Sequence, residues 1–154
     1  MLIKVPSVAN LGLESIKVDI EINLANKGLP GFEIVGLPDK AVDESKERVR
    51  TAIISSGIDF PAKKITINMA PADVPKEGSI YDLPIALGIL SSVLGFKIPE
   101  KSLFFGELSF DGSLRHTKGA FLIALFAKEF GFKNLFVPKD SANEASAIKG
   151  IEVF

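Results

Sequence analysis

The feature that most constrains the fold is a strict two-residue alternation over residues 15–25, which read SIKVDIEINLA. The apolar positions are Ile16, Val18, Ile20, Ile22 and Leu24. Because successive side chains of a strand point to opposite faces, this pattern predicts a strand with one buried face. We expect residues 3–9 to pair with it through a turn at residues 10–14. Residues 32–35 are then expected to supply a third strand of an antiparallel opening sheet.

Helical periodicity follows this opening. A stripe of apolar and small residues between Asp39 and Ser56 predicts one amphipathic helix, and Gly57 is a suitable C-terminal stop. The later patterns predict, in order, a strand over 64–69, a helix over 83–94, a hairpin that turns at Asp111 and Gly112, a helix over 118–130, a buried strand in NLFVP, a short helix over 141–148 and a last strand in IEVF.

Composition narrows the classes of function. A chain of 154 residues suits one domain that buries roughly 70% of its unfolded surface. The absence of cysteine and the single histidine, His116, exclude disulfides, thiolate sites and a histidine-rich metal site. The net charge of −1 is interleaved along the chain, so any nucleic-acid contact must be local. We expect no membrane partner and a cytoplasmic location, because neither a membrane-length apolar run nor a secretory leader pattern is present.

The stretch from Met69 to Leu90 is the most informative for function. A predicted strand leads into a loop, and the loop leads into an apolar helix that begins near Asp82. The loop carries Lys76, Glu77 and Gly78. Unpaired amides and a positive dipole end at such a helix start can stabilise an anion or a reacting group. In the structural alternative, which we favour, the Asp82 carboxylate caps the free amides and Pro84 fits the first turn.

A basic face is the second candidate site, and it comprises Arg48, Arg50, Lys63 and Lys64. Glu44 and Glu47 lie within helical reach of the two arginines and would offset their charge, which favours a solvated face over a nucleic-acid site. The glycine-containing turn over residues 27–32 lacks the helix and spacing of a dinucleotide loop, and no P-loop sequence occurs. No nucleotide cofactor is therefore expected in this segment.

Five ordered blocks span nearly all of the chain. They are KGLPGFEIVGLPD (27–39), ERVRTAIISSG (47–57), FPAKKITINMAPADVPKEG (60–78), YDLPIALGIL (81–90) and FGELSFDGSLR (105–115). In these blocks the chain resembles the N-terminal domain of the magnesium chelatase-like AAA+ proteins of the ComM competence-protein type. The resemblance implies an α+β domain with the βαβ fold of ribosomal protein S-five domain two, which is similar to the Lon proteolytic domain, with a mixed sheet and helices packed on one face.

The likeness to Lon locates the positions of a peptidase dyad. Lon proteases place a nucleophilic serine at the start of the helix after a PKDGPSAG loop, and a lysine base in the helix after the GE-containing hairpin. Here the serine position falls on Ile80 or Tyr81, and the lysine position falls on Phe121. The resemblance therefore implies no catalytic residue. Ser79 and Lys118 lie nearby in sequence, but their use would need a register shift in the loop and nearly a full helical turn.

The resemblance also implies a function for the full-length protein, namely that of an ATP-driven homo-hexamer that promotes DNA branch migration during recombination of transforming DNA. We expect residues 1–154 to form one noncatalytic module that ends before the closing helix of the fold, with an AAA+ motor, its ATP and its Mg downstream. The expected contact loop toward the motor, neighbouring subunits or DNA consists of Lys76, Glu77, Gly78, Tyr81 and Asp82. The alternatives are a metal-insertion subunit with oxygen ligands such as Asp73, Glu77 and Asp82, and a Ser/Lys peptidase.

Overall fold

The structure is a computed structural model that describes residues 2–154. Its largest sheet has four strands in the order β1-β2-β4-β3. These strands are β1 (Leu2–Leu11), β2 (Glu14–Ala25), β3 (Gly31–Val35) and β4 (Lys64–Ala70). β1 and β2 form a long antiparallel hairpin in which Leu11 lies opposite Glu14, and β4 pairs antiparallel with the other edge of β2. The first two predicted strands and their pairing are confirmed.

The prediction that residues 32–35 extend an antiparallel opening sheet is wrong. β3 forms the far edge of the sheet and runs parallel to β4, because β4 occupies the position beside β2. Parallel neighbours need a crossover connection. Two helices supply it, α1 (Lys40–Asp43) and α2 (Ser45–Ser55). The single helix predicted between Asp39 and Ser56 is therefore two helices, which are separated at Glu44.

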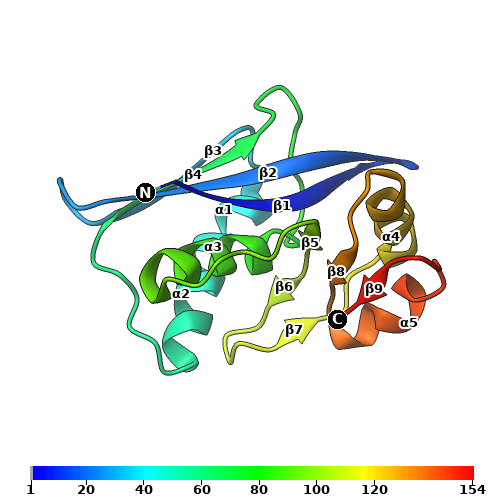
Figure 1. The fold of residues 1–154 in the computed structure, drawn as a ribbon. Coiled ribbons are helices and arrows are strands. Elements are labelled where there is room, and N and C mark those ends of the chain that lie inside the picture. The colour runs from blue at the N-terminus through cyan, green and yellow to red at the C-terminus, as the bar shows by residue number, and fades with distance from the viewer. Residues whose placement is uncertain (1) are drawn as a thin grey trace.

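Helices α2 and α3 (Asp82–Leu94) lie on one face of this sheet, as Figure 1 shows. Alternate residues of the strands and one face of α3 form the main core, which includes Ile20, Ile22, Ile65, Ile67, Ile85 and Ile89. A Cβ at Gly88 of α3 would collide with the Ile22 side chain, so glycine allows this helix to approach the sheet closely. The predicted placement of helices on one face holds for this sheet.

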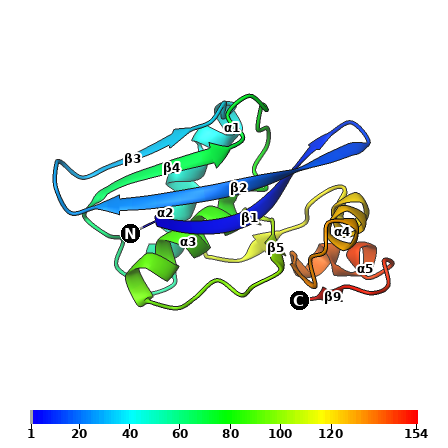
Figure 2. The same cartoon turned by 45° about the horizontal axis from the view of Figure 1, so that its top comes forward.

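A second layer, built on a smaller parallel sheet, follows the four-stranded sheet along the chain. A parallel sheet in the order β5-β8-β9 is made of β5 (Ser102–Phe104), β8 (Asn134–Phe136) and β9 (Glu152–Val153). Figure 2 shows α4 (Ala120–Glu129) and α5 (Ala142–Ala145) beside it, and a 3₁₀ turn over Lys139–Ser141 precedes α5. This layer has its own core, which includes Leu103, Phe105, Ile123 and Leu135. The helix predicted over 141–148 is shorter than expected.

The predicted hairpin at Asp111 and Gly112 is present, as β6 (Glu107–Leu108) and β7 (Leu114–Arg115). The apolar run before it is not one long hairpin arm, because residues 102–104 pair with β8 in the parallel sheet. The chain is thus α+β with a mixed four-stranded sheet, and two smaller sheets accompany it. Among the helices described between residues 2 and 154, none has the length and hydrophobicity needed to cross a bilayer.

Candidate functional site

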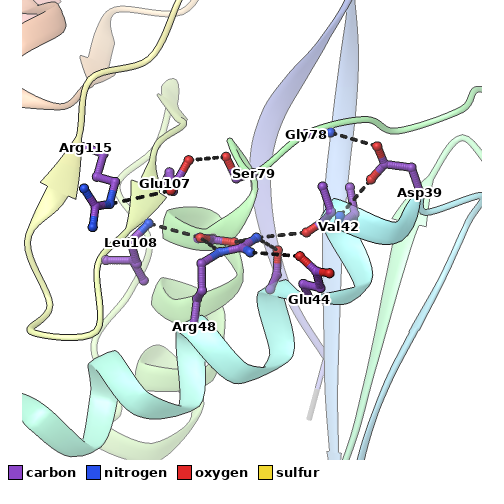
Figure 3. A network of polar contacts seen from close by, with 12 residues as sticks. Asp39, Val42, Glu44, Arg48, Gly78, Ser79, Glu107, Leu108 and Arg115 are labelled. Atoms are coloured by element: carbon purple, nitrogen blue, oxygen red, sulfur yellow. Dashed lines mark hydrogen bonds and ion pairs between the residues drawn. The ribbon is translucent and has the colours of Figure 1, made fainter.

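We call the junction between the end of β4, the loop after it and the start of α3 the corner. It contains two loops that hydrogen bonds hold together. One loop, residues 36–39, follows β3, and the other, residues 71–79, follows β4. The Lys76 amide donates to the Leu37 carbonyl at 3.0 Å, and the Asp39 amide donates to the Lys76 carbonyl at 2.9 Å. The Asp39 carboxylate accepts from the Gly78 amide at 3.2 Å and also caps α1 (Figure 3). The backbone of the corner is therefore fixed on both sides.

Lys76 is fully buried, so the expectation that it is exposed for contact is wrong. Its ammonium donates to the carbonyl oxygens of Gly36, at 2.8 Å, and Pro71. Burial lowers the pKa of Lys76, although the negative charge of Asp73 opposes that shift. Because a buried charged group must keep its hydrogen-bond partners, Lys76 ties the two loops together from within. Of the predicted contact loop, Glu77 is exposed and Gly78 is half-buried.

Asp82 is also fully buried, and it does not cap α3 as the sequence suggested. Arg48 of α2 holds it in a bidentate pair, with Nε to Oδ2 at 2.6 Å and Nη2 to Oδ1 at 3.1 Å. The same guanidinium donates to the Ala41 carbonyl at 2.9 Å. Burial raises the pKa of Asp82 more than the pairing with Arg48 lowers it, and hydrogen bonding to Asp82 raises the pKa of Arg48. The carboxylate joins α3 to α2 and is closed to outside ligands.

The β6–β7 hairpin attaches to this pair. The Leu108 amide donates to Asp82 Oδ2 at 3.1 Å, so one carboxylate connects two helices and a hairpin. Next to it, the Ser79 hydroxyl donates to Glu107, and Arg115 lies 3.7 Å from the same glutamate (Figure 3). Sequence reasoning missed both contacts. The sequence did offer one signal for Asp82, namely a carboxylate at the start of an apolar helix. Such a helix is buried, and a buried carboxylate needs a cationic partner.

Tyr81 is the remaining member of the predicted contact loop, and its side chain is 1% exposed. It therefore belongs to the core and offers no contact surface. Burial raises the pKa of the Tyr81 phenol well above its usual range, and the negative charges of Asp39 and Glu77 raise it further. The phenol thus stays protonated in the folded protein, as an uncharged part of the core.

The two dyad positions of a Lon-like peptidase carry other chemistry in this chain. Ile80 packs against both hydrophobic cores, and Phe121 is 42% exposed on α4. Ser79 has a carboxylate as its hydrogen-bond acceptor, and within residues 2–154 no hydrogen bond joins it to Lys118. A serine nucleophile needs a base within hydrogen-bond reach that can take its proton. In the described residues, Ser79 therefore has no hydrogen-bonded lysine that could act as its base.

The predicted basic face is brought together only in part. Arg48 turns inward to Asp82 and keeps a 3.9 Å contact with Glu44. Arg50 instead lies over the ring of Phe60, 4.6 Å from its centroid, and Phe60 contacts Phe32 at 5.9 Å between centroids. Lys63 and Lys64 are exposed. They lie near Phe32, because the neighbouring Gly31 pairs with Lys64 and the Gly31 amide donates to the Lys63 carbonyl. The remaining face combines three cations with two aromatic rings.

The oxygen ligands considered for a hard cation do not form a site. Asp82 is engaged by Arg48, whereas Asp73 and Glu77 are exposed on the loop. Within the described part of the chain, no three aspartate, glutamate, histidine or cysteine side chains gather in a way that could hold a metal ion. A cation site built from these three carboxylates is not supported.

Comparison with known proteins identifies the family. Residues 20–141 match the family described as "Subunit ChlI of Mg-chelatase". The chain belongs to this family. It is 46% identical over 145 residues to the uncharacterized protein YifB of Escherichia coli, and 44% identical over 144 residues to the competence protein ComM of Haemophilus influenzae. Each match covers 92% of this chain but only 28% of the relative.

A more distant relative belongs to another named group. The DNA repair protein RadA of Aquifex aeolicus is 31% identical over 111 residues, which are 68% of this chain and 24% of that protein. The recognition of a magnesium chelatase-like protein of ComM type is confirmed. The chain spans less than a third of the length of these curated relatives.

Proposed function

We propose that this domain is a noncatalytic N-terminal module of a magnesium chelatase-like AAA+ ATPase whose full-length polypeptide acts on DNA in recombination. The observation that carries the noncatalytic part of the proposal is that the corner has a fixed backbone but no serine and lysine at the expected dyad positions. Its backbone is clamped as a reactive site would need, yet Ile80, Tyr81 and Phe121 occupy the positions of a Lon-like dyad. A domain with a rigid corner and no reactive pair is suited to assembly and contact.

The Lon-like form of the α+β fold and the hexameric state belong to the same proposal. A match of 92% of this chain to 28% of the ComM and YifB polypeptides supports a module within a longer protein. ATP and Mg²⁺ would then bind in the motor region. A P-loop sequence in the coding region after Phe154 is the expected finding, and a continuation without one would contradict the motor.

The DNA-contacting surface that we propose is the basic face as the structure leaves it: Arg50, Lys63 and Lys64 around Phe32 and Phe60. Phosphate groups favour exposed cations, and exposed cations beside aromatic rings are a common arrangement for single-stranded nucleic acid. Arg48 is excluded from this surface because Asp82 holds its guanidinium. The names of the ComM and RadA relatives, one a competence protein and one a DNA repair protein, support DNA as the partner.

The test is fluorescence anisotropy of the full-length protein with single-stranded and branched DNA across salt concentrations. The variant Lys63→Gln/Lys64→Gln should weaken binding and lower the magnitude of the log–log salt slope by about 0.7 to 0.9 for each lost phosphate contact. Lys128→Gln/Lys133→Gln is the matched control, because it removes the same charge from two exposed positions, one in α4 and one just before β8. Equal affinities and slopes for the two double variants would refute this surface.

A further inference from the structure

Helix α4 has no polar face over most of its length. Its sequence reads AFLIALFAKE, so no polar residue precedes Lys128. A helix that is apolar all round is normally covered all round. One side of α4 packs in the second core, through Ala120, Ile123, Ala124 and Ala127. On the other side Leu122 and Leu125 are only half-buried and Phe121 is 42% exposed, so the described residues leave this side of α4 open.

The turn of the long β1–β2 hairpin lies beside α4 and makes this open side one wall of a groove (Figures 1 and 2). The groove has a volume of about 310 Å³, and its apolar lining consists of Leu13, Leu122, Leu125, Phe126 and Phe130. Leu13 is 87% exposed, and Phe130, which stacks on Phe126 at 4.3 Å between centroids, is 63% exposed. A two-residue hairpin turn does not itself require a leucine. The exposed leucine and ring therefore offer apolar surface to a partner.

The charged residues that line the groove are both acidic, Glu14 on β2 and Glu129 at the end of α4. Within residues 2–154, neither carboxylate belongs to an ion pair. Lys128 does not offset them, because its side chain lies along Gly150, where an added Cβ would be 3.5 Å from Lys128 Cε. The C-terminal end of α4 is also the negative end of its helix dipole. The groove is thus apolar inside and negative at its rim.

We propose that this groove binds a cationic amphipathic helix of a partner protein. Apolar side chains of that helix would lie between Leu13 and Leu125, and a lysine or arginine would lie near Glu14 and near Glu129. Leu122, Leu125 and Glu129 follow one another at the three- and four-residue spacing with which helices pack side by side. An amphipathic helix in an apolar groove is a common mode of peptide recognition. The inference does not depend on the proposed function.

A second copy of this domain fits the groove less well. Its most cationic helix is α2, which carries Lys46, Arg48 and Arg50. Lys46 is paired with Asp43 at 2.7 Å, and Arg48 is held by Asp82. The apolar side of α2 is buried in the main core. Among the described helices of a second copy, α2 therefore has no free apolar face to offer, and the required chemistry points to another protein.

The test is fluorescence anisotropy of the full-length protein with a labelled model peptide. The probe is a helix of leucine and lysine with its leucines on one face, and an analogue with glutamate in place of each lysine is the charge control. Leu13→Asn should weaken binding of the lysine peptide about tenfold, because a buried leucine side chain contributes about that factor. Asparagine is tolerated in turns. Leu29→Asn is the matched control, since Leu29 is also 87% exposed and lies in the loop before β3.

The rim charges are tested separately. Glu14→Gln/Glu129→Gln should weaken binding about threefold at low salt and reduce its salt dependence, whereas Glu33→Gln/Glu152→Gln, at exposed positions outside the groove, should not. Equal affinities of Leu13→Asn and Leu29→Asn, or of the lysine and glutamate peptides, would overturn the inference. Absence of binding would also overturn it, and a smaller oligomer of Leu13→Asn in sedimentation would then assign the groove to a second copy.

Discussion

Replacement of Arg48 by methionine should be one of the most damaging single changes in the domain. Asp82 has no exposed surface, and Arg48 supplies two of its hydrogen bonds, at 2.6 and 3.1 Å. In Arg48→Met the carboxylate keeps the Leu108 amide at 3.1 Å but loses its cation. Removal of one partner from a buried ion pair typically destabilises a protein by about 3–5 kcal/mol.

The magnitude is large enough for an equilibrium assay. In a domain of about 150 residues, 1 kcal/mol shifts Tm by roughly 2–4 °C, so Arg48→Met should lower Tm by roughly 6–20 °C. Urea unfolding of the 154-residue chain, followed by circular dichroism, measures the free energy of unfolding directly. Arg48→Lys should recover only part of the loss, because an ammonium cannot form the bidentate pair.

The double variant Arg48→Met/Asp82→Leu distinguishes the cost of an unpaired buried charge from the cost of altered side-chain packing. It removes both charges and replaces them with apolar groups, so it should be more stable than Arg48→Met alone. The reasoning fails if Arg48→Met loses less than about 1 kcal/mol, since the loss would then match a surface ion pair. It also fails if the double variant is less stable than the single one.

Two further predictions concern the backbone of the corner and its tyrosine. Gly36→Ala should destabilise the chain by at least about 2 kcal/mol more than Gly28→Ala, as measured by urea unfolding. Both glycines have similar positive φ, 103° and 99°, but only a Cβ at Gly36 meets the Met69 carbonyl; equal losses would refute the close approach. Tyr81 is the single tyrosine of a chain without tryptophan, so phenolate absorbance reports its ionisation alone. Its folded pKa is raised, so the stability it contributes is full below the unfolded pKa of about 10 and is lost as pH rises further. The absorbance should therefore change only with unfolding, and ionisation near pH 10 in folded protein would contradict its burial.

Local patterns predicted the elements of this fold well. The alternation in residues 15–25 specifies one buried face, and the hairpin turn at Asp111 and Gly112 depends on adjacent residues alone. The partner of β3 could not be predicted in the same way. Whether residues 31–35 pair with β2 or with β4 depends on a strand that begins about 30 residues later, and periodicity carries no information on pairing across that distance.

The site was predicted less well, because its contacts join distant parts of the chain. Arg48 and Asp82 are 34 residues apart, and helical spacing pointed only to Glu44 as a partner for the arginine. Lys76 lies in a loop rich in proline and charge, where lysine is usually exposed. Its burial follows from the packing of that loop on residues 36–39, which arises only in the folded chain.

The central claim is our proposal that the corner around Ser79 is a structural element without catalysis. Casein cleavage by the full-length protein, with ATP present and with Ser79→Ala in parallel, tests this claim most directly. Ser79 donates to Glu107 and, among the described residues, has no hydrogen bond to an amine, so we predict no cleavage above the protein-free blank for either protein. Cleavage that disappears in Ser79→Ala would contradict the account.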